Sequence, residues 1–68
     1  MNIKKSLGSR IKELRKQRNL SQEKLAELVD ISQNALSYIE TGDNFCTSET
    51  IEKLIAALGI DADELFAF

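Results

Sequence analysis

The chain has 68 residues, enough for one small domain, and an apolar fraction of 43% that favours a folded domain over disorder. No apolar run approaches the ~18 residues of a membrane-spanning helix, and none follows the basic N-terminus as in a secretory signal. His is absent, which removes the usual general base and the commonest metal ligand, and a single Cys fits a reducing cytosol. We therefore expect a cytoplasmic protein without catalytic, cofactor, metal or small-molecule sites.

The formal net charge of −2 is distributed unevenly along the chain. Residues 1–20 hold seven basic residues against Glu13 alone, whereas residues 21–68 hold Lys24 and Lys53 against ten acids. This asymmetry favours a positive face on the folded domain. The competing interpretation is a solvated helix with charges placed at random.

The first helix is predicted to begin at Ser6 as its N-cap and to run to about Arg18, with residues 1–5 frayed or extended. Asn19 suits the left-handed position that ends a helix. The apolar positions of this helix follow helical spacing: Leu7, Ile11 and Leu14.

Residues 22–41 are predicted to form two short helices joined by a tight corner. Ser21 is a good N-cap for the first of them, which ends near Val29. Only Asp30 and Ile31 then connect the two helices, so they must cross steeply with the small Ala26 where they meet. The inner face of the helix over 22–29 is predicted to consist of Leu25, Ala26, Leu28 and Val29.

Start and stop signals define the second helix of this pair and two further helices. These signals are Ser32 and Gly42 for a helix over about 32–41, Thr47 or Ser48 and Gly59 for the next, and Asp61 with a capping-box Glu64 for the last. The prediction is an all-α domain. The predicted core comprises Leu7, Ile11, Leu14, Leu20, Leu25, Ala26, Val29, Ile31, Leu36, Ile39, Ile51, Leu54, Ile55, Leu58 and Leu65.

The helix over 32–41 carries uncharged polar side chains on its outer side. They are Gln33, Asn34, Ser37, Tyr38 and Thr41. Such groups both donate and accept hydrogen bonds, and Gln or Asn can form a bidentate pair with adenine in the major groove. A polar surface helix with incidental amides is an equally good interpretation of composition alone.

The segment LGSRIKELRKQRNLSQEKLAELVDISQNALSYIETG, followed by TSETIEKLIAALGIDADELF, resembles the Cro/C1-type (XRE-type) helix-turn-helix domain of phage Cro proteins and repressors. The resemblance implies a five-helix lambda-repressor-like domain over residues 1–68, with its helix-turn-helix unit at 22–41. It implies a transcriptional regulator that places the helix at about 32–41 in the major groove of double-stranded DNA. A dimer on a palindromic operator is also implied.

The resemblance also assigns roles to individual residues. The base-reading positions are Gln33, Asn34, Ser37 and Tyr38. The phosphate-binding positions are Arg10, Gln22, Ser32, Thr41 and Asn44. The loop that holds Thr41, Gly42 and Asn44 is expected to offer backbone N–H groups to phosphate, and Arg15 and Glu40 match a buried or half-buried ion pair of related repressors.

Two residues depart from the family pattern. Asp30 stands where the corner usually has Gly, a position that often needs a positive φ, which Asp tolerates better than most residues. Cys46 stands where Pro is frequent, and we expect a small buried apolar residue there. The acids Glu23, Glu27, Asp43, Glu49 and Glu52 are expected to point away from DNA, and affinity for non-specific DNA to be modest.

Three functional hypotheses differ in class. A DNA-binding regulator would dimerise, with Leu65, Phe66 and Phe68 as a candidate seam. Leu65 is better explained as part of the core, whereas the roles of Phe66 and Phe68 stay open. A protein-interaction or antitoxin-like module on the same fold is the alternative that the acidic helices favour. An enzyme ranks lowest, because neither a Gly-rich phosphate loop nor a cluster of carboxylates is visible.

Overall fold

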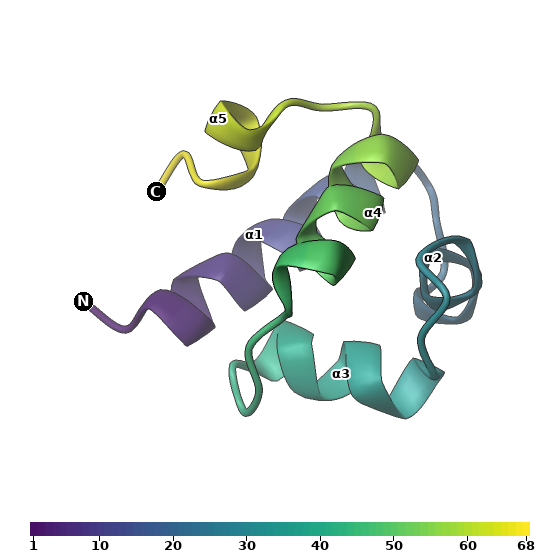
Figure 1. Ribbon diagram of the computed structural model, residues 1–68, viewed down its shortest axis with the longest axis horizontal. Coiled ribbons are helices and arrows are strands. Elements are labelled where there is room, and N and C mark those ends of the chain that lie inside the picture. The colour runs from purple at the N-terminus through teal and green to yellow at the C-terminus, as the bar shows by residue number, and fades with distance from the viewer.

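The computed structural model describes all 68 residues and contains five α-helices and no strand, as predicted. The helices are α1 (Ile3–Gln17), α2 (Gln22–Leu28), α3 (Gln33–Thr41), α4 (Ser48–Leu58) and α5 (Ala62–Leu65). Figure 1 shows α3 along one edge of the molecule, α2 at one end of it, and α5 on the opposite side. No helix combines the length and the apolar character that a bilayer span requires.

Side-chain caps begin four of the helices at the predicted residues. Ser21, Ser32, Thr47 and Asp61 each accept the backbone N–H three residues further on. α3 and α4 end at glycines in the left-handed conformation, Gly42 at φ 84° and Gly59 at φ 66°. The capping box of α5 forms only its first half, because the side chain of Glu64 makes no return bond to Asp61. Short-range chemistry therefore sets these helix ends.

The start of α1 differs from the prediction. Asn2, not Ser6, is the N-cap, and its Oδ1 accepts the N–H of Lys5 at 3.1 Å. Asn caps as well as Ser does, and the earlier cap gains a full helical turn that residues 1–5 were expected to lack. The helix ends at Gln17, and Asn19 adopts the predicted left-handed conformation at φ 55°.

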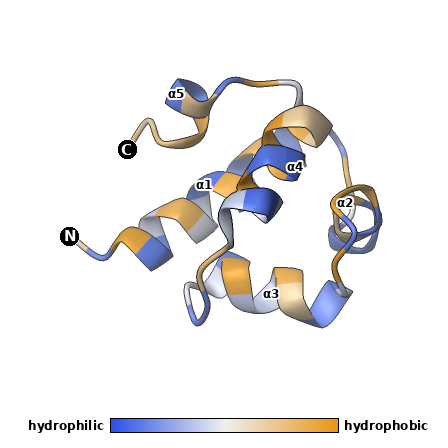
Figure 2. Cartoon of the chain, in the orientation of Figure 1, coloured by the Kyte–Doolittle hydropathy of each residue, from blue (hydrophilic) through white to orange (hydrophobic).

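The core lies between the helices, where Figure 2 shows their hydrophobic faces meeting. Its buried members are Leu7, Ile11, Leu14, Leu25, Ala26, Val29, Leu36, Ile39, Cys46, Leu54, Leu58 and Leu65. The remaining predicted residues, Leu20, Ile31, Ile51 and Ile55, are half-buried against this cluster. The prediction that Leu28 lies on the inner face of α2 is wrong, because its side chain is 47% exposed. The inner face of the short α2 is already filled by its neighbours, so Leu28 points outward.

Gly8 lets α1 and α3 approach at backbone distance, a feature that sequence reasoning missed. A Cβ on Gly8 would lie 2.2 Å from the carbonyl oxygen of Ile39 and 2.7 Å from that of Glu40. Real Cβ atoms do not come that close to oxygen, so only glycine allows this packing. The position of α3 on the core therefore depends on Gly8.

Candidate nucleic-acid interface

The corner between α2 and α3 has the predicted tight geometry. Asp30 adopts the left-handed conformation at φ 58°, which Asp tolerates better than most residues other than Gly. The N–H of Ile31 closes the corner on the carbonyl of Ala26 at 3.0 Å, and Ala26 is buried where the two helices meet. Lys53 Nζ of α4 lies 3.8 Å from Asp30 Oδ2 on the outside of the corner.

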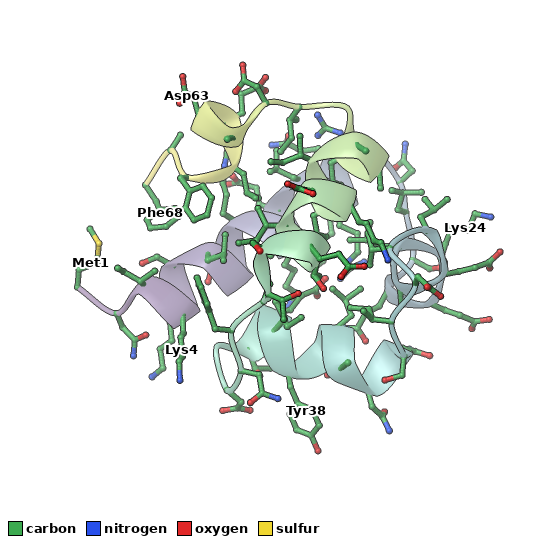
Figure 3. All side chains as sticks on the ribbon, viewed as in Figure 1. Met1, Lys4, Lys24, Tyr38, Asp63 and Phe68 are labelled. Carbon is green, nitrogen blue, oxygen red and sulfur yellow. The ribbon has the colours of Figure 1, made fainter.

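α3 presents an uncharged polar surface to solvent. Gln33, Asn34 and Tyr38 are exposed and Ser37 is half-buried, while Leu36 and Ile39 face the core. None of the four polar side chains forms a hydrogen bond within the chain. Figure 3 shows Tyr38 extending away from the body of the molecule. The donors and acceptors of this reading face are therefore free for an external ligand.

A buried polar network fixes α3 against α1 and α2. The Arg15 guanidinium donates from Nε to Glu40 Oε2 at 2.7 Å and from Nη2 to Glu40 Oε1 at 3.0 Å. Its Nη1 donates to the carbonyl oxygen of Leu20 at 2.9 Å, directly before α2. Gln22 Nε2 donates to Glu40 Oε1 at 3.2 Å. The Glu40 carboxylate thus has three donors from two other segments and leaves no buried polar atom unpaired.

The predicted phosphate-binding side chains are mostly engaged inside the chain. The Gln22 amide contacts Glu40, the Ser32 hydroxyl caps α3, and the Thr41 hydroxyl lies 2.9 Å from Asp43 Oδ2. Arg10 donates to the carbonyl oxygen of Glu64 at 2.9 Å, which places it beside α5 and away from the other predicted residues. Only the side chain of Asn44 is exposed and unbonded.

The turn after α3 does not offer its first backbone N–H groups to solvent, which corrects an expectation. The N–H of Gly42 is bonded to the carbonyl of Ile39, and those of Asp43 and Asn44 to the carbonyl of Tyr38. These bonds satisfy the last carbonyls of α3, as left-handed helix ends do. The carboxylate of Asp43 also lies beside a predicted phosphate-binding residue, because it accepts a hydrogen bond from the hydroxyl of Thr41.

Arginines and lysines have different roles on α1. Each arginine is engaged: Arg10 with Glu13 and the Glu64 carbonyl, Arg15 with Glu40, and Arg18 with the Leu58 carbonyl. The lysines are exposed and have no carboxylate within 4 Å: Lys4, Lys5, Lys12 and Lys16. The planar fork of arginine suits fixed, multiple contacts, whereas the flexible ammonium of lysine favours water. The free positive charge of the basic segment is therefore lysine charge.

Two short helices that meet at a tight corner, the second with a free polar face, define a helix-turn-helix protein. The helix-turn-helix family model matches residues 11–65 of the chain. The control protein C.MunI of a Mycoplasma species is 39% identical over 66 residues, covering 96% of this chain and 89% of that protein. The control protein C.BamHI of Bacillus amyloliquefaciens is 35% identical, covering 98% of this chain and 84% of its own length.

Similarity to a solved structure extends over nearly the whole fold. The restriction-modification controller protein C.AhdI of Aeromonas hydrophila superposes with a TM-score of 0.87 at 37% identity, covering 91% of this chain and 94% of that one. The chain belongs to the helix-turn-helix family. The resemblance to the Cro/C1 type, drawn from sequence, is confirmed.

Proposed function

We propose that the chain is a sequence-specific DNA-binding regulator of transcription that inserts α3 into the major groove. The free polar face of α3 carries the proposal, since Gln33 and Asn34 lie in its first turn with exposed side chains and no partner in the chain. In this geometry the first residues of the second helix reach base edges. A function on DNA also places the chain in the cytoplasm.

Three relatives support a regulatory role for the helix-turn-helix domain. Two of them are named control proteins, and the solved one is called a restriction-modification controller protein. Alignment over 84–94% of their lengths leaves little of them outside the shared domain. We propose that this chain likewise controls gene expression through this domain.

The distribution of charge is compatible with binding on the α3 side. Figure 3 shows Asp63 of α5 on the opposite side of the molecule from Tyr38. The reading face itself is neutral, so non-specific affinity must rest on a few lysines, and the salt dependence of binding is expected to be shallow.

We propose that two copies bind together through the C-terminal end. Leu65 is fully buried and completes the core, so it cannot belong to the seam. Phe66 and Phe68 remain 39% and 45% exposed, with ring centroids 6.1 Å apart. Figure 1 shows the C-terminus at the upper left, beside α5, and α3 along the lower edge of the molecule. A two-fold axis that runs vertically in this view, past the C-terminus, leaves both α3 helices on the same side of the pair.

The dimensions fit this arrangement. The longest extent of the Cα trace is 29 Å, which is of the same order as the ~34 Å between two half-sites one turn of DNA apart. Sedimentation of the double variant Phe66→Ala, Phe68→Ala should show loss of the dimer, with Phe45→Ala as a matched control because Phe45 is 46% exposed on the loop before α4. Dimers of unchanged stability in the double variant would exclude this seam.

The reading face is tested by selecting duplexes from a random pool and measuring mobility shifts on the selected site. The double variant Gln33→Ala, Asn34→Ala should lose preference for that site, by ~1–3 kcal/mol for each lost bidentate contact. Gln17→Ala is the matched control, because Gln17 is an exposed amide on α1 without a partner. Retained preference in the double variant would refute the assignment of α3. An absence of binding to any duplex at low salt would favour a protein-interaction module.

A further inference from the structure

We propose that Lys4 and Lys5, in the first turn of α1, bind DNA phosphates beside the C-terminal end of α3. The inference rests on the proposed function and adds a phosphate contact that neither the sequence pattern nor the family match assigns. It follows from the corrected start of α1, which converts two residues expected to be frayed into part of an ordered helix.

Lys5 lies directly against the residue that ends α3. A Cβ built on Gly42 would be 2.6 Å from Lys5 Cγ and 2.8 Å from Lys5 Cα. The stem of Lys5 therefore packs on the backbone of Gly42, the residue that caps the C-terminal end of α3. The cap by Asn2 holds this turn in place through the N–H groups of Lys5 and Ser6.

Lys4 extends toward the side that α3 presents to DNA. Figure 3 shows Lys4 and Tyr38 both projecting from the same edge of the molecule. A helix in the major groove brings the phosphates of the groove walls to the elements that flank it. The first turn of α1 is such a flanking element at one end of α3.

Both ammonium groups are free to bind an anion. Neither lysine has a carboxylate within 4 Å, and both are exposed. The two basic residues of segment 21–68 are paired instead: Lys24 with Glu27, and Lys53 with Glu49 and Asp30. These paired lysines supply matched controls of the same charge.

The backbone N–H groups that begin the turn after α3 are not available for phosphate. The N–H groups of residues 42–44 are bonded to carbonyls of α3. The turn contains no cation, and Asp43 adds a negative charge. The last turn of α3 likewise contains no basic residue. Cations that compensate for this local negative potential must come from another segment, and Lys4 and Lys5 are placed to do so.

The test compares the salt dependence of binding for the parent and the double variant Lys4→Gln, Lys5→Gln, using fluorescence anisotropy with the selected duplex and a scrambled duplex. The slope of log affinity against log salt should fall by about 0.9 for each lysine. At 0.1 M salt this corresponds to roughly a tenfold loss of affinity for each lysine replaced. The loss should be nearly equal for the selected and the scrambled duplex, because phosphate contacts do not depend on sequence. The variant Lys4→Arg, Lys5→Arg should keep the parental slope.

The control variant Lys24→Gln, Lys53→Gln removes the same charge and should leave the slope close to the parental value. An unchanged slope in Lys4→Gln, Lys5→Gln overturns the inference, whereas the proposed function stands if the parent still prefers the selected duplex. A parent that binds neither duplex overturns both. If the double variant does not fold, the salt dependence of Lys4→Gln alone decides, because Lys4 is exposed.

Discussion

The guanidinium of Arg15 holds both carboxylate oxygens of Glu40, with Nε 2.7 Å from Oε2 and Nη2 3.0 Å from Oε1. This pair joins the second half of α1 to the last turn of α3, 25 residues further along the chain. Both residues are buried, so each charge depends on the other and on the hydrogen bonds around them.

Removing Glu40 alone should lower the free energy of unfolding strongly, whereas replacing Arg15 and Glu40 together should lower it much less. We expect Glu40→Ala to lower the free energy of unfolding by ~3–5 kcal/mol, because it leaves the Arg15 charge buried without a counter-ion. The apolar double replacement Arg15→Met, Glu40→Leu should recover most of this loss. Urea denaturation measures the free energy of unfolding of both variants. Glu13→Ala is the control, because it removes the more exposed pair with Arg10 and should lower the free energy of unfolding by only ~0–1 kcal/mol. A loss below ~1 kcal/mol in Glu40→Ala would contradict a structural role for the pair.

Gln22 should contribute to the stability of the free protein, because its amide donates to Glu40. A double-mutant cycle on Gln22→Ala and Glu40→Ala is expected to give a coupling of ~0.5–1.5 kcal/mol in the free energy of unfolding. The family resemblance implies instead a contact with phosphate. If that is the whole role of Gln22, the cycle measured without DNA gives no coupling.

Gly8→Ala should displace α3, because the added methyl meets backbone carbonyls that cannot rotate away. The expected cost is ~3 kcal/mol or more, at the upper end for overpacked sites, together with weaker binding to the selected duplex. Ser9→Ala, at an exposed position of the same helix, should change stability by less than ~0.5 kcal/mol. Equal stability of the two variants would show that α1 and α3 do not pack at backbone contact.

Asp43→Asn should strengthen DNA binding, because it removes a carboxylate beside Thr41 on the α3 side. An exposed charge near a phosphate is worth ~1 kcal/mol or less in water, so a rise in affinity of about two- to fivefold is expected at low salt. Asp63→Asn, on the opposite side of the molecule, changes the net charge equally. An equal gain from both variants would indicate an effect of net charge alone.

The Cys46 thiol should react slowly in the native protein. Burial raises its pKa above the ordinary value, because desolvation disfavours the thiolate, and the cysteine belongs to the core. Because the folded protein favours the neutral thiol, its contribution to stability is fully present at pH values below the ordinary thiol pKa. The contribution is lost as the pH rises through the raised pKa of the folded state. Iodoacetamide labelling at pH 8 should be much faster in urea than in buffer. Equal rates would place Cys46 outside the core.

The sequence by itself determined the elements that depend on neighbours within one helical turn. Four caps, the left-handed residues at Asn19, Asp30 and Gly42, the apolar stripes and the polar outer face of α3 all follow from such local rules. The start of α1 was the exception, because Asn2 and Ser6 are equally good caps and only the packing of the first turn on Gly42 distinguishes them.

Only the tertiary structure decided which side chains are free. Three residues carry the right chemistry for phosphate but are bonded within the fold: Arg10, Gln22 and Thr41. The partner of Arg10 lies 54 residues away in the sequence, and that of Gln22 lies 18 residues away. Lys4 and Lys5 are free and stand beside α3 because Gly8 and Gly42 allow α1 to lie against its backbone. Contacts between distant segments depend on how the helices pack, and the periodicity of one segment carries no record of that packing.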